Sequence, residues 1–251
     1  MKTPRKHKSA VPVIAFTLAL SIILFTLLSS QVRADPAGAT LGTVSSSTAV
    51  AVVPGNRSDA GGTINTMDVN ARQQDADWKA YVGNVSGVLT LDDSSGFSIF
   101  QWALSASQIT GRLYVSRAST IGWSTVNCSN ISLITSESSL MGFVPTSVDD
   151  INRTFNATAH PPIFVAGRTI NANTCRSTAT FVNNTIQTDV ANANFPEVLM
   201  EDNVANLIYV TPLDQGHSSY QTGTNVDYQV IVPDDVTTAT TRYYFYLELG
   251  S

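Results

Sequence analysis

The residues whose types and spacing most clearly suggest a binding site are acidic pairs at expected turns. Asp75 and Asp77 form one such pair, and Asp92 and Asp93 form another. Hard cations take about six to eight oxygen ligands, often from loop carboxylates together with backbone carbonyls. The spacing of these acids is not that of an EF-hand, so the sequence supports a Ca²⁺ site as a hypothesis that rests on these four residues.

Catalytic motifs do not accompany these acids. The chain has no nucleophile elbow, zinc-protease helix, phosphate-binding loop or dinucleotide-binding glycine pattern. His160 and His217 are the histidines that follow residue 34, and both fall in expected loops, where histidines are usually solvated. A Ser–His–Asp triad assembles in space, so the sequence alone leaves it open. The pattern favours a non-enzymatic protein.

Two cysteines, Cys128 and Cys175, are present. An even number of cysteines in an exported chain is typical of disulfide bonding. A metal site would need further cysteines or histidines at ligand spacing, and neither cysteine has them. We therefore predict one disulfide.

Glycosylation sequons of the form Asn-x-Ser/Thr recur along the chain. In a sequence this rich in Asn, Ser and Thr, some of them arise by chance, but their number fits a protein that tolerates a glycan coat. The candidate sites are Asn56, Asn84, Asn127, Asn130, Asn152, Asn156 and Asn183.

The N-terminus is typical of exported proteins. Four basic residues precede an apolar run over residues 11–28, and small residues at Val32 and Ala34 fit a cleavage site. We predict a signal peptide over residues 1–34 that is cleaved after Ala34; the alternative is a retained membrane anchor. All 19 acidic residues lie beyond Ala34. The exported part is therefore acidic, which argues against nucleic acid as a partner.

Residues 35–63 are small and polar, with several glycines and prolines, and are typical of a flexible leader. Within it, residues 47–53 are uncharged and β-prone, with Thr48, Val50 and Val52 alternating along one side. This segment is either an ordinary first strand of the domain or a donor strand that completes the sheet of a neighbouring subunit. The domain itself is expected over residues 64–251.

After Trp78 the chain consists of short alternating runs separated by turn residues. The clearest is residues 243–249, where Tyr243, Phe245, Leu247 and Leu249 are expected on one face. Residues 97–104 also alternate, with Phe100, Trp102 and Leu104 on one face. These patterns predict an all-β fold, specifically an antiparallel β-sandwich or jelly roll.

Helical signals are weak and predict one or two short helices. Residues 146–151 resemble a capping box, and residues 195–200 place Pro196 at a first helical position.

Residues 78–87 (Trp-Lys-Ala-Tyr-Val-Gly-Asn-Val-Ser-Gly), residues 89–93 and the closing aromatic run at 243–248 resemble a domain of uncharacterised exported prokaryotic surface proteins. The segments 123–124, 151–155 and 173–175 are similar to it as well. The resemblance covers about residues 64–250. It implies an extracellular or cell-surface location and pairs the two cysteines, and it brings no catalytic residues.

Together these features predict a secreted, non-enzymatic structural protein of the cell surface or extracellular matrix. It would be a filament subunit whose partner is a second copy of itself, or would bind other surface proteins. The alternative is a secreted module that binds carbohydrate or another ligand. Exposed tryptophans would favour that alternative, because indole rings stack on sugars, although tryptophans of a sandwich more often lie in the core.

Overall fold

The computed structural model describes residues 35–42, 45–104, 109–235 and 240–250. The predicted signal peptide lies outside these ranges. Within them, no helix is long and apolar enough to cross a membrane.

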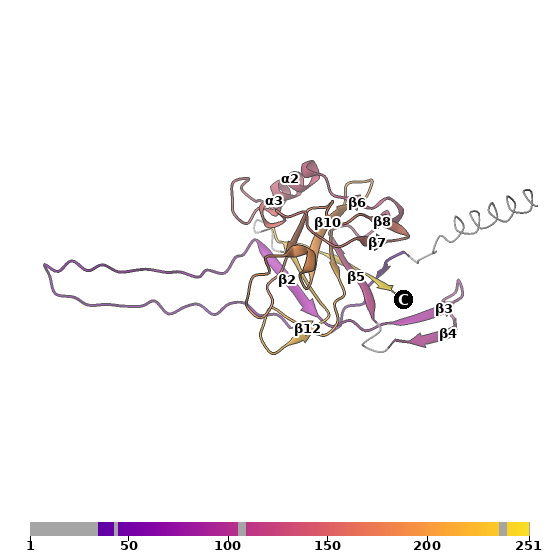
Figure 1. Cartoon of the computed structure of the whole chain (residues 1–251), viewed down its shortest axis with the longest axis horizontal. Coiled ribbons are helices and arrows are strands. Elements are labelled where there is room, and N and C mark those ends of the chain that lie inside the picture. Colours follow the sequence, from indigo (N-terminus) through magenta and orange to yellow (C-terminus); the bar gives the residue numbers. More distant parts are fainter. Residues whose placement is uncertain (1–34, 43–44, 105–108, 236–239, 251) are drawn as a thin grey trace, which may run out of the picture.

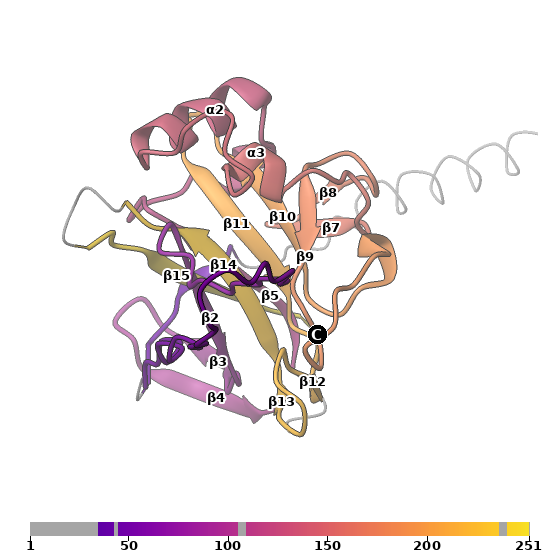
Figure 2. The same cartoon turned by 90° about the vertical axis from the view of Figure 1, so that its left-hand side faces the viewer.

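A seven-stranded antiparallel sheet forms the centre of the body (Figures 1 and 2). Its order is β1 (Ala37–Gly38), β15 (Tyr244–Gly250), β5 (Thr110–Ser116), β11 (Leu207–Pro212), β10 (Pro196–Glu201) and β6 (Asn127–Cys128), with β9 (Ser177–Ala179) beside β6 on the outer edge of β10. Both faces of this sheet are covered. Strands β5, β10 and β11 therefore contain continuous apolar runs rather than a strict alternation with polar residues.

The first face packs against a two-stranded ribbon and two helices. The ribbon pairs β2 (Trp78–Gly83) with β14 (Tyr228–Pro233), and the helices are α2 (Ile131–Leu140) and α3 (Ile151–Thr154). Leu113, Tyr209 and Val230 lie in this core. Glu197 also faces it, and its carboxylate accepts a hydrogen bond from the Ile231 amide at 2.9 Å. Burial raises the pKa of Glu197 well above its usual value.

The second face packs against the short ribbon β7 (Ile163–Val165) and β8 (Arg168–Ile170) and against the 3₁₀ turn Trp123–Thr125. Tyr114 and Tyr246 flank Trp123 there, with ring centroids about 5 Å apart in each pair. A second 3₁₀ turn, Val190–Asn192, and the small ribbon β12 (His217–Ser218) and β13 (Asn225–Val226) complete this part of the chain.

The structure confirms an antiparallel all-β fold with few short helices; the sandwich or jelly-roll arrangement stays a prediction. The alternation expected over 243–249 is confirmed, because Tyr243, Phe245, Leu247 and Leu249 contact the first core while Tyr244 and Tyr246 contact the second.

Both predicted helices differ in the structure. Residues 195–200 form no helix and instead supply β10, which has pairing partners on both edges. Pro196 begins that strand, a position where its missing amide is tolerated. The helix expected over 146–151 starts later, at Ile151, with Asp150 as its N-cap.

Helix α2 has no counterpart in the prediction. Asn130 caps it by accepting from the Leu133 amide at 2.9 Å. The guanidinium of Arg117, at the end of β5, holds Glu137 of α2 through two bonds of 2.7 and 2.6 Å. A tertiary ion pair thus fixes a helix whose sequence shows little amphipathic pattern.

The structure joins Cys128 to Cys175. Cys128 lies in β6, and Cys175 lies just before β9, so the disulfide ties together the two short strands that share the outer edge of β10. No free cysteine occurs among the described residues.

His160 is buried beneath this crosslink rather than solvated in a loop. Its Nε2 accepts hydrogen bonds from the amides of Thr174 and Cys175 at 3.0 and 2.9 Å. The proton of the neutral ring must then reside on Nδ1, which donates to the Pro161 carbonyl at 2.7 Å. Burial lowers the pKa of His160 below its ordinary 6.5.

This arrangement predicts a loss of stability in mild acid. Because the pKa of His160 is lower in the folded state than in the unfolded state, the unfolded state binds more protons below pH 6.5, and the free energy of unfolding falls as the pH drops through that window. Urea unfolding at about pH 7.5 and about pH 5.5 measures the difference. His160→Gln, whose side-chain oxygen can still accept a hydrogen bond, should reduce this pH dependence. An unchanged dependence would show that His160 does not govern it.

Candidate assembly surface

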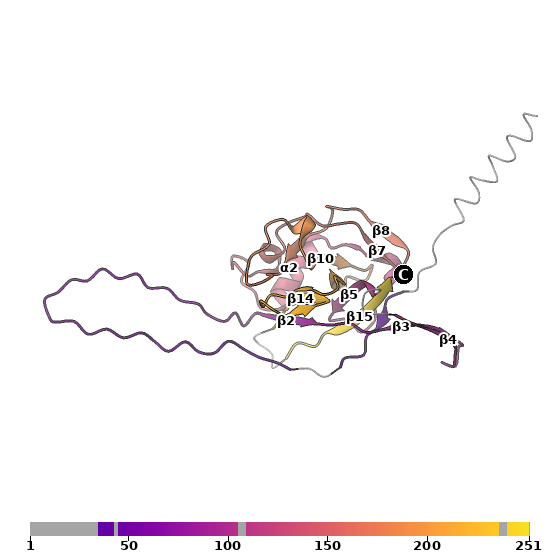
Figure 3. The ribbon, with the colours of Figure 1, turned by 60° about the horizontal axis from the view of Figure 1, so that its bottom comes forward.

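Two parts of the chain lie outside the packed body. The first comprises residues 45–76, between β1 and β2, which run out from the body and back as a long extended loop (Figures 1 and 3). No backbone–backbone hydrogen bond involves residues 45–76. The polar contacts recorded within the loop are local, such as the Arg57–Asp59 ion pair. Apart from the Ala60 carbonyl, which accepts from the Thr63 hydroxyl, the backbone groups of residues 45–74 have no hydrogen-bond partner among the described residues.

The predicted donor segment lies on this loop. Val50, Val52 and Val53 are 90%, 80% and 85% exposed, and Thr48 is exposed as well. No residue from Thr48 to Val53 pairs with another strand or carries a charge. The alternative that this segment is an ordinary first strand of the domain is therefore wrong.

The first residues of the leader nevertheless pair with the central sheet. Ala37 and Gly38 form β1, which lies opposite Leu247 and Tyr246 at the edge of β15. The Ala39 amide continues this contact by donating to the Phe245 carbonyl at 2.8 Å. The expected flexible leader is thus anchored at one end to the central sheet. The domain is expected to begin at residue 64, whereas the first strand after the leader, β2, begins at Trp78.

The second part is the hairpin of β3 (Val88–Asp92) and β4 (Ser98–Ala103), which pairs with no other strand. Leu89 and Leu91 lie opposite Trp102 and Phe100, so these four side chains share one face. The rings of Phe100 and Trp102 meet edge to face at 4.8 Å. No hairpin side chain belongs to either core, and every residue of β4 is exposed.

Phe97 and Ile99, near the turn, are 74% and 79% exposed. The alternation expected over residues 97–104 is present, and Leu104 packs against the first core, but Phe100 and Trp102 on the same face contact neither core. Of the three tryptophans, Trp123 is buried and Trp78 packs on Phe143 and Phe155, whereas Trp102 is about half exposed.

The loop and the hairpin project from opposite ends of the body (Figures 1 and 3). Thr48–Val53 of the loop and the strands of the hairpin are β-prone and carry exposed apolar side chains, and among the described residues neither pairs with another strand of the body. Monomeric proteins rarely leave contiguous large apolar side chains in water, and such patches commonly mark interaction sites. The geometry therefore fits two different contact surfaces on one molecule.

The four acids of the Ca²⁺ hypothesis do not come together. Asp75 and Asp77 instead meet Asp149, with one carboxylate oxygen of each within 4.8 Å of the others. Asp92 and Asp93 belong to no such group among the described residues. Asp93 accepts from the amides of Ser95 and Phe97 in the hairpin turn, and Asp92 accepts from the hydroxyls of Thr90 and Ser98.

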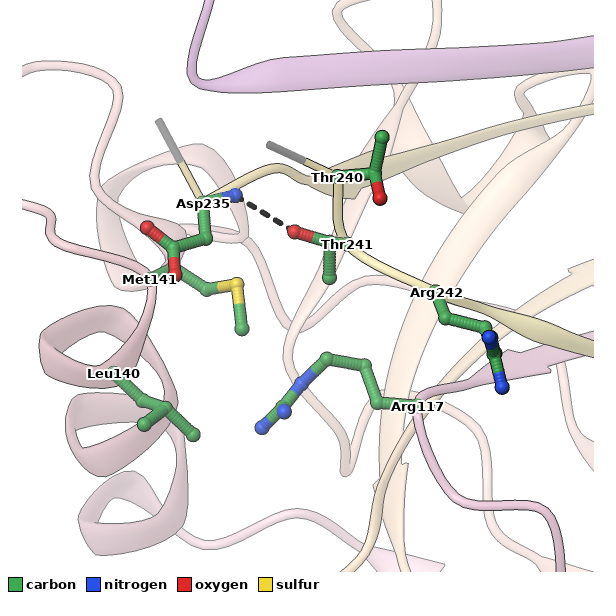
Figure 4. Close-up of a pocket in the computed structure, with 7 residues that line it drawn as sticks. All are labelled: Arg117, Leu140, Met141, Asp235, Thr240, Thr241 and Arg242. Atoms are coloured by element: carbon green, nitrogen blue, oxygen red, sulfur yellow. Dashed lines mark hydrogen bonds between the residues drawn. The ribbon is translucent and has the colours of Figure 1, made fainter. Parts of the chain in front are cut away.

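A shallow pocket of about 320 Å³ lies beside α2 (Figure 4). Arg117 and Arg242 contribute cations, and Leu140 and Met141 contribute an apolar wall. The guanidinium of Arg117 points toward this wall, but its charge is balanced by the bidentate contact with Glu137. Besides this neutralised cation and Arg242, the polar lining of the pocket consists of Asp235, Thr240 and Thr241.

The sequons lie on the body and on the loop. Those at Asn56, Asn84, Asn127, Asn130, Asn156 and Asn183 are exposed, and Asn152 is half-buried. Asn130 is already engaged, because its side-chain nitrogen donates to both carboxylate oxygens of Glu201 while its oxygen caps α2. A glycan on Asn130 would replace one of these contacts.

The acidic cluster yields a stability prediction. Partial burial and the nearby charges of Asp149 and Asp75 raise the pKa of Asp77, so the free energy of unfolding falls as the pH rises through the window above 3.8. Asp77→Asn should raise the free energy of unfolding at pH 7 by about 0.5 kcal/mol, the scale of a surface charge contact. Asp68→Asn, an exposed acid outside the cluster, is the matched control. Equal urea midpoints for both variants and the wild type would contradict the prediction.

The chain matches no known protein family, no curated protein and no solved structure in the three comparisons made. The resemblance to exported surface domains therefore stays a prediction, and any functional proposal must rest on the geometry of the residues described.

Proposed function

We propose that this chain is an exported structural subunit of the cell surface or extracellular matrix that assembles with copies of itself by strand addition. The added strand is Thr48–Val53. The observation that carries the proposal is an uncharged β-prone segment held away from its own body with neither backbone nor side-chain partners.

Two effects would drive strand addition: the backbone groups of the donor segment gain hydrogen bonds, and its apolar side chains are removed from water. Adding a strand to a sheet edge pairs the free backbone groups, while alternate side chains enter pockets of the acceptor. Burying Val50 and Val52, which are 90% and 80% exposed and lie on the same side of an extended strand, contributes about 3 kcal/mol before the cost of association. The backbone bonds add to this and fix the register.

The disulfide supports the exported location, since structural disulfides persist in oxidising surroundings. The acidic composition and the exposed sequons are compatible with a hydrated outer surface. Loop and hairpin present different surfaces at opposite ends, which favours head-to-tail contacts that repeat indefinitely over a closed dimer.

The second candidate is a carbohydrate-binding module, favoured by the exposed aromatic pair Phe100 and Trp102. Aromatic faces of this kind can stack on sugar rings. Glycan-array binding by monomeric protein, abolished by Trp102→Ala, would support this candidate in place of assembly.

The test replaces one valine of the donor segment. Val52→Lys puts a charge where the proposal requires burial, so we expect the concentration needed for assembly to rise at least tenfold. Ile64→Lys is the control, because Ile64 is fully exposed on the same loop but outside the donor segment. Sedimentation velocity and negative-stain electron microscopy measure the assembly.

Because neither residue contacts the cores, both variants should keep the melting temperature of the wild type. If the wild type remains monomeric at millimolar concentration, or if Val52→Lys assembles as the wild type does, the proposal is wrong.

A further inference from the structure

We infer that the acceptor for the donor segment is the outer edge of β4 in the β3–β4 hairpin of the next molecule. This inference rests on the proposed function and names its binding partner, a second copy of this chain. The hairpin would become a three-stranded sheet in the order β3, β4 and the incoming Thr48–Val53.

The composition of β4 singles out this edge. Exposed sheet edges are usually protected by charges, prolines, bulges or shortness. Strand β4 runs for six residues, Ser-Ile-Phe-Gln-Trp-Ala, with neither a charge nor a proline. The register of the hairpin shifts between Leu91 and Asp92, where Ile99 of β4 is left without a partner residue on β3. Among the described residues, no strand pairs with the outer edge of β4, and the register of β4 is regular from Phe100 to Ala103.

Other described edges are less suitable. Strand β2 carries Lys79 near its start, and β6 and β9 are two and three residues long and tied by the disulfide. The outer edge of β15 is already occupied in part by β1. Strand β14 is uncharged, but it ends in Pro233 and most of its residues are buried, so none of these edges offers six exposed, uncharged residues.

The lengths and side-chain patterns of the two segments match. Thr48–Val53 also spans six residues, and Val50 and Val52 project to one side of an extended strand. Placed beside β4 with these valines on the face of Phe100 and Trp102, the donor extends that apolar face. Ala51 then falls on the opposite face, on the side of Gln101.

A third strand would stabilise the hairpin. A two-stranded hairpin is marginally stable alone in water, whereas three strands with a hydrophobic face can be stable. Leu89, Leu91, Phe100 and Trp102 already form that face without a layer beneath it. A third strand supplies both the missing pairing and additional apolar area.

The occupant must come from another molecule, because the loop and the hairpin of one chain point in opposite directions (Figures 1 and 3). The donor segment begins about ten residues after β1, a contour of roughly 35 Å, and this reach is directed away from the hairpin of its own chain. The loop of one copy therefore meets the hairpin of the next. Since the two surfaces differ, the contact does not close on itself and propagates as a filament.

Cysteine crosslinking between two single-cysteine variants tests the inference. Ala51→Cys is mixed with a mass-tagged variant carrying Ile99→Cys, Gln101→Cys or Ala103→Cys, and the mixture is oxidised gently. These substitutions leave Val50, Val52, Phe100 and Trp102 in place, and the native disulfide leaves no other described cysteine free. Because each cysteine is on a different molecule, a mixed-mass product is necessarily intermolecular.

We expect at least one of the three β4 cysteines to crosslink with Ala51→Cys at least tenfold faster than a control cysteine on the competing edge of β2, Ala80→Cys, which is also exposed. Assembly with a faster crosslink to the β2 control, or with no crosslink to β4, overturns the assignment of β4 and leaves strand addition standing. Absence of assembly in the mixtures and in the wild type overturns the proposed function and this inference together.

Discussion

The structure depends on how completely each strand is covered. Strands β5, β10 and β11 are paired on both edges and buried on both faces, and their apolar runs have no alternative to the interior of a layered body. Two ribbons, two helices and a 3₁₀ turn serve mainly to cover this sheet. The disulfide and buried His160 then hold β6 and β9 against the edge of β10. The strands of the central sheet are therefore paired and covered by residues of the same chain.

The loop and the hairpin lack the pairing and cover that the strands of the central sheet have. The donor segment and the hairpin consist of residues that favour strands, yet neither the donor segment nor the apolar pair Phe100 and Trp102 of the hairpin is covered by the described residues of its own molecule. Local sequence preference and local burial therefore disagree at both places. Such disagreements are expected at functional sites, where a sequence is adapted to something other than the fold of one chain. Self-assembly resolves both disagreements with a single contact.

Much of the fold could be predicted from the sequence because its signals were local. The period-two pattern of 243–249 specified the two faces of β15, and the cysteine count specified the disulfide. Tertiary context overrode local signals elsewhere. Pro196 suggested a helix start, but pairing on both edges made residues 196–201 a central strand. Helix α2 depends on Asn130 and on Arg117, which is distant in sequence. The exposure of Phe100 and Trp102 had no local signal, since an alternating strand looks the same whether or not a layer covers it.

The central claim is that the donor segment and the outer edge of β4 are unpaired in the monomer and pair with each other in the assembly. Hydrogen exchange of the backbone amides, compared between monomeric and assembled protein, tests this most directly. The account predicts that amides of residues 48–53 and those on the outer edge of β4 exchange rapidly in the monomer and at least a hundredfold more slowly in the assembly, while the central sheet is slow in both. Equal, rapid exchange of residues 48–53 in the two states would contradict it.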